Sequence, residues 1–128
     1  MDMQGALRAR ITGAATSAGT RVYWVDRPQA AALPAVTLQI VSDPRPQHLK
    51  GFDSKFGTLV QIDCWGDSYG AVAALKEAVL AAVVPENTSN GIVFDRAMIE
   101  TTRDLGERTE TKFVHRASID VTVWWRPA

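Results

Sequence analysis

The chain has 128 residues, and its 14 Lys and Arg are balanced by 14 Asp and Glu, which makes the formal net charge zero. This length predicts a single domain over residues 1–128, large enough to fold without a disulfide or a metal. The missing basic excess argues against a general nucleic-acid binder, and a net charge near zero tolerates or favours association between protein molecules.

Cysteine usage and the amino terminus indicate a protein of a reducing cytosol. The lone Cys64 cannot form an internal disulfide, and no spacing of His, Cys and Asp is typical of a metal site, so we expect neither metal nor cofactor. Asp2 stands where a secretory signal carries basic residues, and no apolar segment follows it. No stretch approaches the roughly 18 apolar residues of a membrane span, so we expect no membrane contact.

The first third of the chain predicts one helix and two strands. Residues 2–16 form the helix, with an apolar stripe made by Met3, Leu7, Ile11 and Ala14. Residues 21–25 are rich in β-branched and aromatic types and predict a short strand. After a loop at 26–34, residues 35–42 alternate apolar and polar side chains, as a second strand does.

Residues 43–56, with the sequence DPRPQHLKGFDSKF, differ in kind from the segments around them. They hold two prolines, one glycine and five formal charges, and they show no consistent period. The segment is too long for a tight hairpin, and loops above about 12 residues are usually functional or mobile. We therefore expect a long functional loop here.

The middle of the chain predicts a strand followed by a helix. Residues 57–66 form the third strand, with Val60, Ile62 and Cys64 on one face. Asp67 and Ser68 supply an amino-terminal cap, and the second helix runs from Tyr69 to about Val84, where Pro85 ends it.

The last third predicts two more strands. Residues 86–91 are expected to form a turn, residues 92–104 a fourth strand, residues 105–110 a hairpin loop and residues 111–126 a fifth strand. The order α-β-β-β-α-β-β indicates an α+β fold, with a mostly antiparallel sheet of about five strands and two helices on one of its faces.

Catalytic residue types are scarce. His115 shares its strand face with apolar residues, His48 lies in the long loop, and Cys64 lies among Val60 and Ile62, which favours a buried, inert thiol. The sequence offers no phosphate loop and no nucleophile elbow. We therefore expect no catalytic residues.

Two further function classes remain open at this point. A ligand-binding or enzymatic α+β domain would need Asp63, Asp67 and His115 to converge on one pocket. Nucleic-acid binding would use the arginines of the first third of the chain, Arg8, Arg10, Arg21 and Arg27.

The tryptophans indicate that the second face of the sheet contacts a partner. Trp124 and Trp125 are adjacent on a strand, so they must point to opposite faces of the sheet, and Trp65 falls on the face opposite Cys64. Large aromatic side chains outside the core are typical of interfaces. The alternative is that the amino-terminal helix or loops cover that second face.

Three stretches of the sequence resemble the tail completion proteins of long-tailed phages, also found in prophages and gene transfer agents and called tail terminator or head–tail joining proteins. The first joins Arg21-Val22-Tyr23 to Pro28-Gln29 and to Leu33-Pro34-Ala35-Val36. The second runs from Val60 to Tyr69 (VQIDCWGDSY), and the third from Arg116 to Trp125 (RASIDVTVWW). Together with the first helix they span nearly the whole chain.

The resemblance implies a structural virion protein with an α+β fold and no enzymatic activity. Such a protein forms a hexameric ring that caps the tail tube, ends tail elongation and joins the tail to the neck below the head. Its implied partners are copies of itself, the tail tube protein and neck or connector proteins, while DNA passes through the lumen without specific binding. It is assembled in the host cytoplasm and resides at the tail–neck junction of the virion.

The resemblance also implies that the long loop at 43–56 is mobile in the monomer and takes part in assembly. A head-side connector or stopper protein is the alternative within the phage neck. The expected assembly residues, taken from this loop and from the tryptophans, are Arg45, His48, Lys50, Phe52, Lys55, Phe56, Trp65 and Trp124.

Overall fold

The computed structural model describes residues 2–14, 16–25, 32–44, 47–48, 51–52, 55–108 and 113–127, with residues 47, 48, 51, 52 and 107 described by their backbone. Two helices and nine strands follow one another along these residues. They are α1 (Met3–Gly13), β1 (Val22–Trp24), β2 (Ala35–Ser42), β3 (Gln47–His48), β4 (Gly51–Phe52), β5 (Phe56–Gly66), α2 (Tyr69–Val83), β6 (Asn87–Ser89), β7 (Ile92–Phe94), β8 (Met98–Arg108) and β9 (Phe113–Pro127).

The two helices begin where short polar side chains accept the first free amides. Asp2 Oδ1 accepts a hydrogen bond from Gly5 N at 2.8 Å, and Ser68 Oγ accepts one from Ala71 N at 3.1 Å. The predicted cap of α2 is thus confirmed at Ser68. The first helix ends at Gly13, three residues before the predicted end, and Ala14 is an exposed cap residue outside the buried stripe of Met3, Ala6, Leu7 and Ile11.

Seven of the strands form one curled sheet with the order β1-β2-β5-β9-β7-β6, in which β8 also pairs with β9. All pairings are antiparallel except β1–β2, which is parallel. The predicted α+β class is therefore confirmed, whereas the expected count of about five strands is too low. The parallel pair makes the sheet mixed.

The fourth predicted strand is in fact two strands. β7 pairs with the end of β9, and β8 pairs with its first ten residues, from Phe113 to Thr122. Residues 95–97 break the run because Asp95 N donates to Trp124 O and Ala97 N to Val84 O, which turns the chain between the two pairings. The predicted hairpin loop at 105–110 is also wrong as far as Arg108, because β8 continues to that residue; residues 109 and 110 lie outside the described residues.

The predicted turn at residues 86–91 contains the strand β6 and a two-residue hairpin turn. Asn90 and Gly91 have φ values of 51° and 81°. Both values are positive, as the two-residue turn that best matches strand twist requires, and Asn-Gly is its preferred sequence. The signal for this hairpin was therefore present in the sequence.

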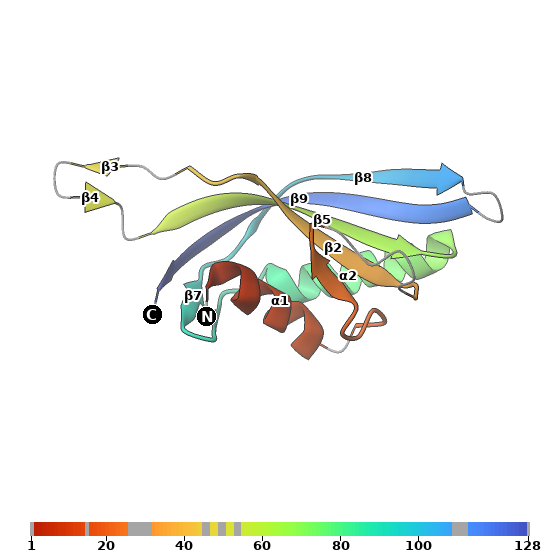
Figure 1. The fold of residues 1–128 in the computed structure, drawn as a ribbon, viewed down its shortest axis with the longest axis horizontal. Helices are drawn as coiled ribbons and strands as arrows, with labels where there is room; N and C mark the ends of the chain where they lie inside the picture. The colour runs from red at the N-terminus through yellow and green to blue at the C-terminus, as the bar shows by residue number, and fades with distance from the viewer. Residues whose placement is uncertain are drawn as a thin grey trace.

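Both helices lie against one face of the sheet, as predicted (Figure 1). The core fills the space between that inner face and the helices, and it draws on α1, α2 and five strands of the sheet, β1, β2, β5, β7 and β9. Leu7, Ile11 and Leu75 are each buried to 1% exposure or less. Burial of one such side chain contributes about 1.5–3 kcal/mol, and a helix of 11 residues is marginal without such packing.

Arg10 fastens α1 to the end of α2. Its Nη2 donates to Ala82 O at 2.8 Å and to Pro85 O at 2.7 Å, and its guanidinium lies 4.9 Å from the centre of the Phe94 ring. These carbonyls belong to the last turn of α2 and the residues after it, where no further amide of the helix can reach them. Burial lowers the pKa of Arg10 from its ordinary value.

We expect Arg10→Met to lower the free energy of unfolding by about 2 kcal/mol, because it removes the two hydrogen bonds that a charged donor makes to the carbonyls of Ala82 and Pro85. Chemical denaturation followed by circular dichroism measures this loss. Arg96→Met is the matched control, since Arg96 is exposed. Equal stabilities of the two variants would contradict the role given to Arg10.

Candidate assembly surface

The face of the sheet that points away from the helices, here called the outer face, is not covered by α1 or α2 (Figure 1). The alternative that the amino-terminal helix covers it is therefore wrong, because α1 packs beside α2 on the other side. Because side chains alternate along a strand, every second residue of β2, β5 and β9 faces this side. These residues are Thr37 and Gln39 in β2, those from Leu59 to Trp65 in β5, and those from Arg116 to Trp124 in β9.

One half of the outer face is closed by its own polar side chains. Trp65 Nε1 donates to Thr37 Oγ1 at 3.0 Å, and the Arg116 guanidinium lies 4.9 Å from the centre of the Trp65 ring. Asp63 accepts a hydrogen bond from Gln61 Nε2 at 3.1 Å and lies 3.9 Å from Arg116 Nη1. Trp65 therefore covers its own sheet, and Thr37 and Asp63 beneath are only 8% exposed.

The other half of the outer face exposes apolar surface around Trp124. This side chain is 40% exposed, while its neighbour Trp125 is 8% exposed, so the predicted opposite orientation of the two is confirmed. The Trp124 ring lies directly on Gly57, because a Cβ there would stand 2.5 Å from the ring. Only glycine fits opposite Trp124, and the sequence pattern did not predict this contact, although a glycine inside a strand can signal such close approach.

Leu59, Met98 and Trp124 form what we call the Trp124 patch. Leu59 and Met98 both stand opposite Thr122 in the sheet, two residues from Trp124, and Met98 is 58% exposed. Lys55 borders the patch, with its Nζ 5.8 Å from the centre of the Trp124 ring and ion-paired to Asp95. An exposed aromatic side chain with apolar neighbours and a charged rim has the composition of a protein interface.

The segment between Asp43 and Phe56 is anchored at both of its ends. Thr58 Oγ1 donates to Asp43 Oδ1 at 2.8 Å and accepts from Trp125 Nε1 at 2.9 Å. The Phe56 ring lies 4.9 Å from the Trp125 ring. We call these four residues the anchor; sequence spacing could not reveal it, because Thr58 and Trp125 are 67 residues apart.

The anchored segment contains a short β-ribbon in place of an unbroken loop. β3 and β4 pair through Gln47 with Phe52 and through His48 with Gly51. Figure 1 shows this ribbon beyond the end of the main sheet. Phe56 belongs to β5, so the loop predicted to end at Phe56 ends one residue earlier.

Of the eight expected assembly residues, six are described and fall into three groups. Lys55 and Trp124 are exposed and lie together, whereas Phe56 is half-buried in the anchor and Trp65 is half-buried in the polar cluster. His48 and Phe52 lie in the β-ribbon. Arg45 and Lys50 lie outside the described residues.

The groups proposed for an enzymatic site do not converge. Asp63 stands opposite Ser118 of β9, whereas His115 lies three residues before Ser118 on the same strand. Because side chains alternate along a strand, Asp63 points to the outer face and His115 to the inner face. The centre of the His115 ring lies 4.8 Å from the centre of the Phe113 ring and 6.5 Å from that of Tyr69. Asp67 lies beyond the end of β5, before the cap of α2.

Cys64 is fully buried, as predicted. Burial, helped by the negative charge of Asp63, raises the pKa of the thiol to about 12 from its ordinary value of 9.0. At neutral pH the side chain is therefore a thiol, which is a poor nucleophile. Within the described part of the chain no three His, Cys, Asp or Glu residues are placed to hold a metal ion.

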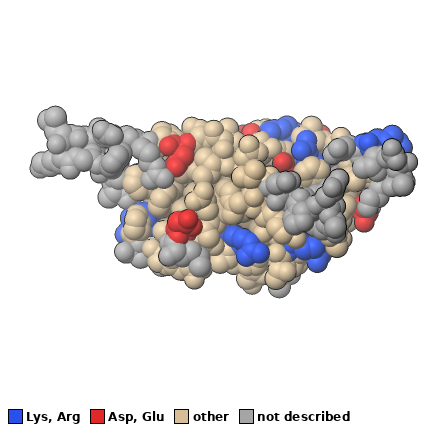
Figure 2. All heavy atoms as spheres, viewed as in Figure 1, with Lys and Arg blue, Asp and Glu red and all other residues tan. Residues whose placement is uncertain are grey.

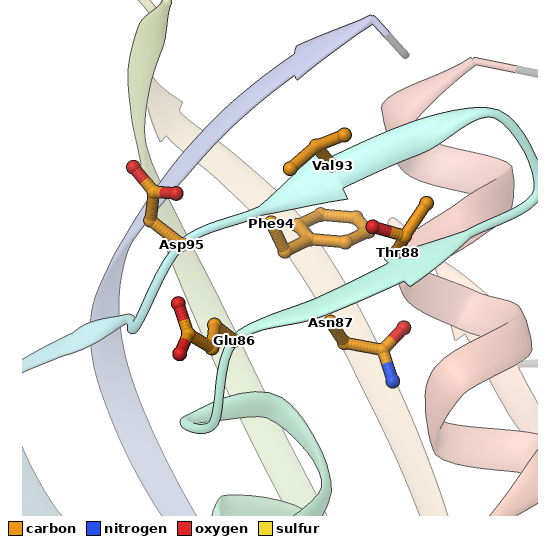
Figure 3. A pocket seen from close by; sticks show the side chains of 6 residues that line it. All are labelled: Glu86, Asn87, Thr88, Val93, Phe94 and Asp95. Atoms are coloured by element: carbon orange, nitrogen blue, oxygen red, sulfur yellow. The ribbon is translucent and has the colours of Figure 1, made fainter.

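A hollow of about 230 Å³ lies where α2 passes into β6 and β7, lined by Glu86, Asn87, Thr88, Val93, Phe94 and Asp95. In Figure 3, Glu86 and Asp95 lie on the same side of the Phe94 ring. Asp95 is already paired with Lys55. None of the residues singled out for catalysis lines this hollow, which has no histidine or cysteine of its own.

The described arginines of the first third of the chain are engaged within the protein. Arg8 Nε donates to Val22 O at 2.7 Å, Arg21 Nε to Pro34 O at 2.9 Å, and Arg10 to the carbonyls at the end of α2. Arg27 lies outside the described residues. Figure 2 shows Lys and Arg interspersed with Asp and Glu on this face of the molecule. Three of the four arginines that nucleic-acid binding would use, Arg8, Arg10 and Arg21, therefore hold backbone segments together.

Comparison with known proteins gives one family and a shared fold. The family model described as "Tail completion protein gp17" matches residues 1–126. A chain of a solved structure described as "Virion of native gene transfer agent (GTA) particle" superposes with a TM-score of 0.69 at 16% identity, covering 97% of this chain and 94% of that one. A second solved chain gives a TM-score of 0.57 at 12% identity, with 98% and 93% covered. No curated protein matches.

We expect Thr58→Val to lower the free energy of unfolding by about 2 kcal/mol, because it removes the hydroxyl that accepts from the buried Trp125 Nε1 and donates to Asp43. Thermal and chemical denaturation measure the loss. Thr58→Ser keeps the hydroxyl and is expected to retain most of the stability. A full loss in the serine variant as well would mean that the methyl group, and not the hydrogen bonds, matters here.

Proposed function

The chain belongs to the tail completion protein gp17 family, and from this premise we propose that it is a structural virion protein that forms a ring on the end of the tail tube. The ring ends tail elongation and joins the tail to the neck below the head. The observation that carries the proposal is the family match over residues 1–126, which leaves almost none of the chain outside it.

The ring is built from copies of this chain, and we propose six of them, to match the sixfold symmetry of the tail tube. Contacts in such a ring are heterologous: one surface of each copy meets a different surface of the next, and the rotation between copies closes the circle. The equal number of positive and negative groups suits this arrangement, because it leaves little net repulsion between copies.

The Trp124 patch and the β-ribbon at 47–52 are the surfaces we assign to assembly. The patch is exposed but conformationally held, since Gly57 lies beneath the ring and Lys55 beside it. A side chain that is fixed before binding loses less conformational entropy when a partner covers it. The anchor acts in the same direction, because it fixes both ends of the segment that carries the ribbon.

In the proposed ring, DNA has to pass through the lumen without binding tightly to the protein. Tight binding to phosphates requires several free Lys or Arg groups side by side. The described arginines Arg8, Arg10 and Arg21 instead donate to carbonyls, and charges of both signs alternate over the face in Figure 2. We propose accordingly that this protein guides DNA without binding it and performs no catalysis.

No helix in the described ranges has the length and apolar character to cross a membrane.

Removal of the gene from the particle that encodes it tests the proposed role. We expect tails longer than normal and not joined to heads, because tube subunits continue to add to an uncapped end. Electron microscopy of the particles measures tail length and attachment. Tails of normal length beside heads that have lost their DNA would overturn the capping role in favour of a head-side connector or stopper.

Shortening the β-ribbon separates assembly from folding. We expect replacement of residues 46–53 by a short Gly-Ser linker to change the free energy of unfolding by less than about 1 kcal/mol, since the core and the anchor remain. The same variant is expected to fail to restore normal tails in the deletion strain. Trp124→Ala is the companion variant on the patch. Normal tails with either variant would remove that surface from the proposal.

A further inference from the structure

The strand β8 has an exposed edge along its whole described length. One edge pairs with β9, and none of the described strands pairs with the other edge. Every residue from Met98 to Gly106 is exposed, including three large apolar side chains: Met98 at 58%, Ile99 at 43% and Leu105 at 38%. In Figure 1, β8 lies at the margin of the sheet, and neither helix lies over its margin.

An edge of this length is a template for another strand. The outward N–H and C=O groups of an edge strand form hydrogen bonds with any extended segment laid beside them. Native proteins usually shorten such edges, bend them or cover them. β8 has 11 residues and one irregularity, near Glu100, so residues 101–108 remain a regular, open edge.

We infer that the open edge of β8 pairs antiparallel with β8 of a second copy of this chain, centred on Leu105. In this register Leu105 meets Leu105 of the partner on the outer face, and residues 102–108 pair with one another. Arg103 then stands opposite position 107, a glutamate, and Asp104 stands diagonal to Arg108. Registers centred on Arg103 or Asp104 would set two like charges on the symmetry axis, which is unfavourable.

Charges already present on the outer face are compatible with this pairing. Arg103 Nη1 lies 3.1 Å from Asp120 Oδ2, so one nitrogen of its guanidinium is engaged within the chain. A guanidinium carries five N–H donors, so the others remain available for a second acceptor. The exposed Leu105 side chains would at the same time be removed from water.

This contact is different from the contacts of the proposed ring and does not rest on them. A twofold contact uses the same surface on both copies and is complete with two chains, whereas a ring needs two different surfaces on each copy. The β8 pair is therefore a dimer of the free chain that hides its open edge.

Cross-linking of Leu105→Cys tests the register. We expect this variant of the full chain to form a disulfide-linked dimer on mild oxidation, because the two side chains face each other on the axis. Met98→Cys is the control: it is exposed on the same strand, but two copies would lie about 46 Å apart, at seven residues from the axis on each side. Cys64 is buried and remains unreactive in both variants.

Light scattering over a concentration series tests the dimer without a cysteine. We expect the native chain to reach the mass of two chains, and Leu105→Lys, which places like charges on the axis, to raise the dissociation constant at least about tenfold. Loss of the dimer in Leu105→Lys with unchanged thermal stability supports the pairing. A native chain that stays monomeric overturns it, as does a native chain that assembles further while the Leu105→Cys variant does not cross-link; the latter result would leave the proposed ring intact.

Discussion

The strand β9 is the element on which the rest of the structure depends. Its 15 residues pair with all 11 residues of β5 on one side, and with β8 and then β7 on the other. Because side chains alternate along a strand, β9 sends Ala117, Ile119 and Val121 into the core and presents Arg116 and Asp120 to the outer face. One strand thus links the core, the uncovered face and the strands β5, β7 and β8.

Both helices pack on the inner face, so the side chains of the outer face are covered only by one another or are exposed to water. Near Trp65 they are covered through hydrogen bonds and an arginine laid over the ring, and near Trp124 apolar surface is left exposed. The difference has a steric side: Gly57 lets the Trp124 ring lie on the sheet, and with Lys55 beside it the ring is still 40% exposed. A surface that is closed at one end and open at the other fits a protein that assembles through a limited part of its sheet.

Polar side chains hold the outlying segments to this sheet. Arg10 joins the two helices, Arg21 joins the segments around β1, and Thr58 joins both ends of the segment that carries the β-ribbon. Two of these three residues are arginines that satisfy carbonyls in irregular backbone, where regular pairing is not available. The charged groups of this neutral chain are therefore partly structural, which leaves fewer of them free for partners.

The sequence by itself determined the elements whose signals are local. Alternation predicted β2 residue for residue and β5 to within one residue, periodicity and the Ser68 cap predicted α2, and adjacency forced Trp124 and Trp125 to opposite faces. Tertiary structure alone decided the split of β7 from β8, the parallel place of β1 and the partners of Arg10 and Thr58. In each case the deciding hydrogen bond joins residues far apart in the chain, such as Ala97 to Val84 or Trp125 to Thr58, and a local pattern carries no information about it.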